Sequence, residues 1–126
     1  MTKLDTGNID MMIEKVCRIP VEFKSAGTRS VNDLVKESGY LENTAFLTVE
    51  SVESCLRKHP GLANAWLQYS EDKRTDAGWY LRRIGEGTEY EMGRLQTGER
   101  AEFADYVRAA AEFVIREVRS IQHHMT

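Results

Sequence analysis

The amino-acid sequence predicts a small α+β domain, in which several helices precede an antiparallel β-hairpin and a long C-terminal helix. Three observations lead to this prediction. Apolar residues recur at helical spacing through much of the first 73 residues. Residues 79–94 then alternate between apolar and polar side chains around a glycine-containing turn. After Thr97 the helical repeat returns and continues almost to the end of the chain.

The length and composition fit one domain. A chain of 126 residues can bury a hydrophobic core without the help of disulfide bonds or a structural metal ion. Its hydrophobic share of 41% and charged share of 29% are close to those of ordinary soluble domains, so disorder of the whole chain is not expected. We predict a flexible tail over residues 1–8 and a single α+β domain over residues 9–126.

The charge and hydropathy patterns argue against two classes of partner. The net charge is -3, whereas nonspecific nucleic-acid binding draws on a basic surface. The apolar runs fall far short of the roughly 20 residues that span a bilayer. The first residues also lack the apolar core of a signal peptide. We therefore expect a soluble, cytoplasmic protein that binds neither nucleic acid nor membranes.

The first predicted helix starts at Asn8, which is suited to cap it, and ends near Arg18 or Ile19. Its end is set by Pro20, because a proline disfavours the helical conformation of the residue before it. Residues 21–24 alternate between apolar and polar side chains and predict a short strand. If this strand joins the hairpin, the sheet is three-stranded, which is the alternative to a two-stranded hairpin.

Capping residues mark the next helices. Ser30 and Asp33 resemble a capping box, and Gly39 is suited to end the short helix that follows. Another helix is expected to start at Thr44 or Thr48. Beyond it, proline is well tolerated as a first helical residue, which predicts a further helix over residues 60–73.

The segment from Trp79 to Arg94 predicts the hairpin. A two-residue turn at Glu86-Gly87 places Leu81 opposite Met92 and Arg82 opposite Glu91. One face of the hairpin then collects apolar and aromatic side chains, and the other collects most of the charge, as in a sheet with one buried face. The buried face is predicted to hold Trp79, Leu81, Tyr90 and Met92, and the other face Tyr80, Arg82, Ile84, Glu89 and Glu91.

The C-terminal helix is predicted to start at a Thr97 cap. Its apolar arc, which includes Phe103 and Phe113, is wider than the single stripe of a surface helix. Such a helix either crosses the centre of the domain or meets a second copy, so a homo-oligomer through this helix is one hypothesis.

No catalytic or cofactor motif is present, and we expect no cofactor. Cys55 and His59 are four residues apart, which suits metal ligation, but two residues do not make a site. We therefore predict no metal site and no catalytic residue. Cys17 and Cys55 form no CxxC motif and are predicted to be reduced thiols.

The stretch from Ser70 to Arg83 is the candidate binding site. It has an ordinary structural interpretation, as the corner where a helix gives way to a strand. It also has a functional interpretation, because charged groups beside aromatic rings suit a protein partner or a polar ligand. The candidate ligand- or partner-binding residues are Asp72, Lys73, Arg74, Asp76, Trp79 and Tyr80.

Two functional hypotheses follow. The first is a small protein-binding domain without catalytic activity, comparable to inhibitors or immunity proteins. The alternative is an enzyme or small-ligand-binding protein with a polar pocket near residues 72–80. The absence of catalytic motifs in the sequence favours the first.

Overall fold

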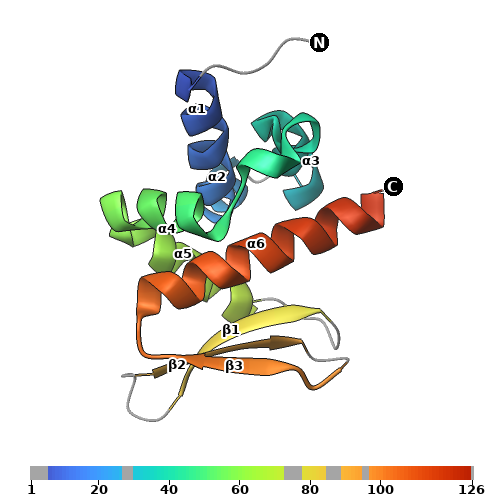
Figure 1. The fold of residues 1–126 in the computed structure, drawn as a ribbon. Helices are drawn as coiled ribbons and strands as arrows, with labels where there is room; N and C mark the ends of the chain where they lie inside the picture. Colours follow the sequence, from blue (N-terminus) through green and yellow to red (C-terminus); the bar gives the residue numbers. More distant parts are fainter. Residues whose placement is uncertain (1–5, 27–29, 73–77, 85–88, 95–96, 126) are drawn as a thin grey trace.

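The protein is a small α+β domain, as predicted. The structure is a computed structural model that describes residues 6–26, 30–72, 78–84, 89–94 and 97–125. In the described chain, helices α1 to α5 come first, a three-stranded antiparallel sheet follows, and the long helix α6 closes the fold (Figure 1). The α-helices are α1 Thr6–Cys17, α2 Ile19–Ala26, α3 Val31–Ser38, α4 Val49–Lys58, α5 Pro60–Asp72 and α6 Tyr106–Met125. Two short 3₁₀ helices, η1 Tyr40–Glu42 and η2 Thr44–Phe46, lie between α3 and α4. The strands are β1 Trp79–Ile84, β2 Glu89–Arg94 and β3 Arg100–Phe103.

The predicted strand at residues 21–24 is wrong, because these residues belong to α2. Pro20 is the second residue of that helix, where its missing N–H costs nothing, since the first turn has no intrahelical acceptor for it. The proline does separate two helices, and α1 ends at Cys17 close to the predicted position. The start of α1 lies at Thr6, two residues before the predicted cap at Asn8.

The predicted caps of the middle helices are confirmed. The Ser30 hydroxyl accepts a hydrogen bond from the Asp33 backbone N–H, and the Asp33 carboxylate accepts one from the Ser30 N–H. Gly39 ends α3 in the left-handed conformation, with φ of 89°. Thr48 caps α4, and Pro60 is the first residue of α5.

The predicted hairpin register is confirmed. Leu81 pairs with Met92, and Arg82 pairs with Glu91. The predicted turn at Glu86-Gly87 lies outside the described residues. Strand β3 was not predicted, and it occupies the segment that was expected to begin the last helix.

The predicted Thr97 cap is therefore wrong. Helix α6 begins at Tyr106, and the Asp105 carboxylate caps it by accepting hydrogen bonds from the backbone N–H groups of Val107 and Arg108, at 3.0 and 3.3 Å. Asp105 meets the requirement for a side-chain acceptor at the first turn as well as a threonine does.

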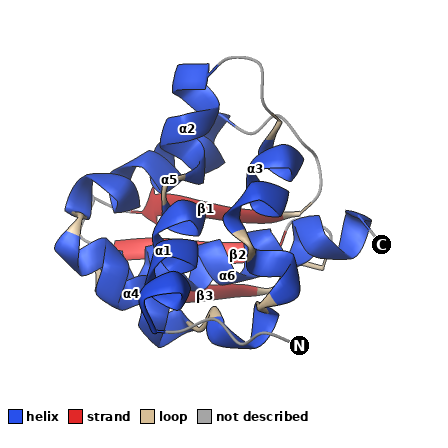
Figure 2. Cartoon of the chain, turned by 90° about the horizontal axis from the view of Figure 1, so that it is seen from above, coloured by secondary structure: helices blue, strands red, loops and turns tan. Residues whose placement is uncertain are grey.

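Helix α6 is the centre of the domain. It lies across the inner face of the sheet, with α4 against its other side (Figure 1), whereas α5 contacts both α6 and β1. Seen from above, the helices overlie all three strands (Figure 2). Phe113 is fully buried within the single chain. This position accounts for the wide apolar arc of α6 without a second copy, and the homo-oligomer stays an untested prediction.

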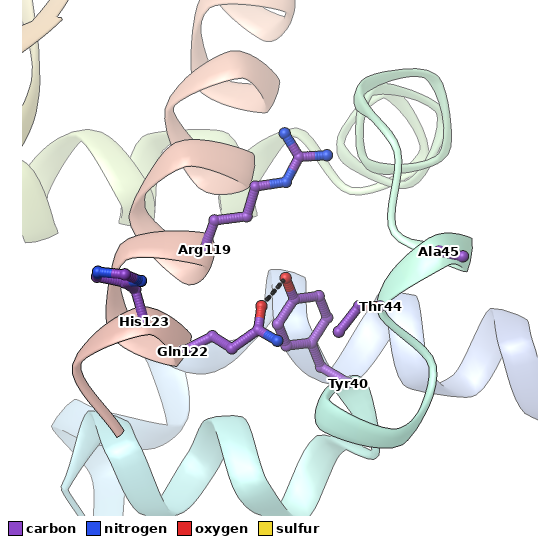
Figure 3. A pocket seen from close by; sticks show the side chains of 6 residues that line it. All are labelled: Tyr40, Thr44, Ala45, Arg119, Gln122 and His123. Atoms are coloured by element: carbon purple, nitrogen blue, oxygen red, sulfur yellow. Dashed lines mark hydrogen bonds between the residues drawn. The ribbon is translucent and has the colours of Figure 1, made fainter. Parts of the chain in front are cut away.

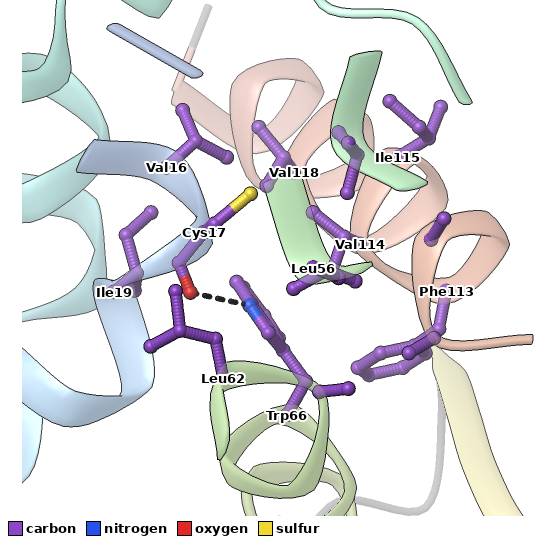
Figure 4. Packing of buried hydrophobic residues seen from close by; sticks show 14 of the residues in the cluster. Val16, Cys17, Ile19, Leu56, Leu62, Trp66, Phe113, Val114, Ile115 and Val118 are labelled. Carbon is purple, nitrogen blue, oxygen red and sulfur yellow. Dashed lines mark hydrogen bonds between the residues drawn. The ribbon is translucent and has the colours of Figure 1, made fainter. Parts of the chain in front are cut away.

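Trp66 of α5 lies in the middle of the core (Figure 4). Its ring makes edge contacts with Tyr69 and Phe113, with ring centroids 5.2 and 6.0 Å apart. Its indole N–H donates a hydrogen bond to the backbone carbonyl of Cys17, at 2.8 Å. Because Cys17 is the last residue of α1, this bond satisfies a carbonyl that the helix itself leaves unpaired.

No helix in the described part of the chain is long and apolar enough to cross a bilayer.

Candidate functional site

The outer face of the sheet is the candidate functional site. Within the described residues, every helix lies on the other side of the sheet (Figure 1). The register and the strict alternation of strand side chains decide which residues face outward. They are Tyr80, Arg82 and Ile84 of β1, Glu89, Glu91 and Gly93 of β2, and Arg100 and Glu102 of β3.

A buried carboxylate lies at the centre of this open face. Glu91 is only 3% exposed, although no helix in the described chain covers it. The Tyr80 hydroxyl and the Arg82 Nε both donate to Glu91 Oε2, at 2.9 and 2.7 Å. The Arg100 guanidinium lies 3.8 Å from Oε1. The side chains of the neighbouring strands therefore close over the carboxylate and hold one another in place.

Gly93 makes room for this arrangement. A Cβ atom at position 93 would come within 2.6 Å of the Tyr80 hydroxyl oxygen and within 2.5 Å of the backbone oxygen of Glu99. Because the glycine has no side chain, the Tyr80 ring lies over β2 and its hydroxyl reaches Glu91. The position of the tyrosine thus depends on a residue on the next strand.

The electrostatics keep Glu91 ionised. Burial by itself raises the pKa of this carboxyl group, but the hydrogen bonds from Tyr80 and Arg82 and the charges of Arg82 and Arg100 outweigh it and bring the pKa below its ordinary value. Burial and the hydrogen bond to Glu91 raise the pKa of Tyr80. A carboxylate whose pKa is lowered and whose oxygens already accept hydrogen bonds is a poor general base, so the geometry suits recognition better than proton transfer.

Replacement of Glu91 by glutamine is expected to lower the free energy of unfolding by about 1 to 2 kcal/mol at pH 7, because neutral hydrogen bonds replace charge-assisted ones. Since the pKa is lowered in the folded state, this stabilisation exists above the unfolded pKa near 4.5 and is lost as the pH falls through the folded pKa. Urea denaturation at pH 7 and pH 3 should show the difference between wild type and Glu91→Gln shrinking in acid. Glu89→Gln, on the same face but exposed, is the control, and a difference independent of pH would contradict the assignment.

The structure separates the two predicted aromatic residues. Trp79 lies on the inner face and is half-buried, as predicted, with the guanidinium carbons of Arg94 and Arg116 at 5.7 and 5.3 Å from its ring centroid. Tyr80 lies on the outer face, also half-buried. The two do not form one patch, and Tyr80 is the member that belongs to the candidate site.

The remaining predicted residues lie largely beyond what the structure describes. Asp72 is the last residue of α5, and its side chain is not described. Lys73, Arg74 and Asp76 fall outside the described residues, so their role stays a prediction. The same holds for a polar pocket near residues 72–80.

Sequence reasoning predicted the Arg82–Glu91 pair but missed the burial of Glu91. That burial depends on Tyr80 reaching across the sheet over Gly93 and on Arg100 arriving from β3. The one signal of β3 in the sequence is the short alternation Arg100-Ala101-Glu102-Phe103.

The prediction that the chain has no metal site stays untested. Among the described residues, no group of three or more potential ligands lies together. His59 lies 3.7 Å from the Glu14 carboxylate. Cys17 is buried and Cys55 half-buried, and both are free thiols.

No protein-family model, curated protein or solved structure matches the chain.

Proposed function

We propose that this protein is a non-catalytic protein-binding domain, and that its partner docks on the outer face of the sheet around Tyr80, Arg82 and Arg100. The observation that supports this most is the closed arrangement over Glu91. It fixes a tyrosine and two arginines on a face that no helix in the described chain covers.

The residue types suit this role. Tyrosine and arginine are enriched among the residues that dominate binding energy at protein interfaces. The Arg82 and Arg100 side chains are 59% and 69% exposed, so their outer N–H groups can reach a partner, while Glu91 holds Arg82 by a hydrogen bond and attracts Arg100 by its charge. Because the side chains are held before binding, docking loses less conformational entropy than it does with free arginines.

The flanking charge indicates what the partner presents. Exposed Glu89 and Glu102 lie beside the arginines on the same face. A partner with both acceptors for the guanidinium groups and donors for these two carboxylates would be complementary to this face.

Arg82→Ala is expected to weaken partner binding at least tenfold, because it removes an anchored arginine from the centre of the face. Arg83→Ala is the matched control: Arg83 is exposed on the same strand but points to the opposite face. The partner would first be captured with the wild-type chain from extracts of the organism that encodes it. Its affinity for the three chains would then be measured by calorimetry.

Two results would contradict the proposal. One is that no protein is retained by the wild-type chain. The other is that a retained protein binds the Arg82→Ala and Arg83→Ala chains equally well. Thermal unfolding of both variants checks that any loss of binding does not reflect loss of folding.

A further inference from the structure

A second surface feature lies away from the outer sheet face. A cleft of about 530 Å³ opens between the C-terminal part of α6 and the short helices η1 and η2 (Figure 3). This volume lies in the range of small-molecule sites. The cleft is lined by Tyr40, Thr44, Ala45, Arg119, Gln122 and His123.

The lining is positively charged and rich in hydrogen-bond donors. None of its six residues is acidic, and Arg119 carries a permanent positive charge. Thr44 and Gln122 add a hydroxyl and an amide. His123 projects from α6 on the side away from Thr44 in Figure 3 and is exposed.

Arg119 differs from the other arginines of α6. Arg108 lies 2.9 Å from the Glu53 carboxylate, and Arg116 pairs with Glu112. Arg119 is exposed and forms no ion pair with a carboxylate in the part of the chain that the structure describes. Its guanidinium interacts with the hydroxyl group of Tyr40, which is uncharged, so no carboxylate of the described chain neutralises its charge.

Tyr40 fixes the orientation of the neighbouring amide. Its side chain is buried at 2% exposure, and its hydroxyl donates to Gln122 Oε1 at 2.9 Å (Figure 3). With the amide oxygen bound in this way, the amide nitrogen has no hydrogen-bond acceptor among the described residues and can donate to a ligand. Burial raises the pKa of Tyr40, and the nearby Arg119 opposes that rise, so the tyrosine stays a neutral donor at physiological pH.

We propose that this cleft binds a small organic anion, whose carboxylate or phosphate group is held by the guanidinium of Arg119 and the amide N–H of Gln122. A guanidinium presents paired N–H groups that match both kinds of anion. This site is independent of the protein-binding face, so either proposal can fail without the other.

The test is an NMR titration of the full chain with inorganic phosphate and, separately, with acetate, at constant ionic strength. We expect saturable shifts of the Arg119 Nε–H and Gln122 side-chain amide signals, with dissociation constants in the millimolar range. Saturation by phosphate alone assigns a phosphorylated ligand, and saturation by acetate assigns a carboxylate.

Arg119→Gln should weaken the binding of the effective ion at least tenfold, read from the Gln122 amide. Lys58→Gln is the matched control, because it removes one positive charge from the exposed far end of α4. The proposal is overturned if neither ion gives saturable shifts, or if the Arg119→Gln chain binds as tightly as the Lys58→Gln chain.

Discussion

Trp66→Ala is expected to lower the free energy of unfolding by about 4 to 5 kcal/mol, near the top of the range for large-to-small core substitutions. The side chain is fully buried, and its ring makes edge contacts with Tyr69 and with Phe113, which lies near it in Figure 4. Its removal leaves a cavity between α5 and α6 and also removes the donor to the Cys17 carbonyl. A domain of this size has a total stability of roughly 5 to 15 kcal/mol, so the variant should be close to unfolding at 37 °C.

Trp66→Phe separates the two contributions. It keeps most of the ring volume but loses the N–H, which leaves the Cys17 carbonyl without this donor at the end of α1. A cost of about 1 to 3 kcal/mol is expected for the unpaired group and the smaller ring. Urea denaturation followed by far-UV circular dichroism measures both variants. If Trp66→Ala costs less than about 2 kcal/mol, the indole is not the centre of the core.

The hairpin register could be predicted because it depends on residues close together in the chain. Pairing Leu81 with Met92 was the one register that placed apolar residues together on a single face. The helix caps were predictable for the same reason, since Ser30 and Asp33 are only three residues apart. Sequence patterns that span a few residues are therefore sufficient to predict contacts between residues that are close in the chain.

The missed strand β3 shows where such short sequence patterns are not sufficient. Strand β3 has only four residues, and Phe103 fits the apolar spacing of the next helix as well as the alternation of a strand. Tertiary pairing with β2 decided between these two interpretations. The strand prediction for residues 21–24 was wrong for a similar reason, because an alternation of four residues is too short to distinguish a strand from a helix turn.

The candidate sites were harder to predict than the fold. The outer-face site joins residues from three strands, one of them unpredicted, and the burial of Glu91 depends on Gly93 leaving space for Tyr80. The cleft joins η1 and η2 to a helix about 80 residues away in the sequence, as the Tyr40–Gln122 hydrogen bond shows. A single sequence carries no signal for contacts at that separation.

The central position of α6 leads to the second large prediction. Ala109, Ala110 and Ala111 are consecutive and all fully buried. Successive helix residues point about 100° apart, so three of them cover more than half of the helix circumference. Alanine at these positions lets the sheet and the helices approach α6 closely from both sides.

Ala110→Leu is therefore expected to lower the free energy of unfolding by about 3 kcal/mol, because the larger side chain has to displace a packed neighbour. Ala104→Leu, at an exposed position just before α6, should change it by less than about 0.5 kcal/mol. Urea denaturation measures the free energy of unfolding of both variants, and light scattering measures the molar mass of the wild type and hence its oligomeric state. A neutral Ala110→Leu would mean that α6 has unfilled space beside it, and its wide apolar arc would then again favour a second copy of the chain.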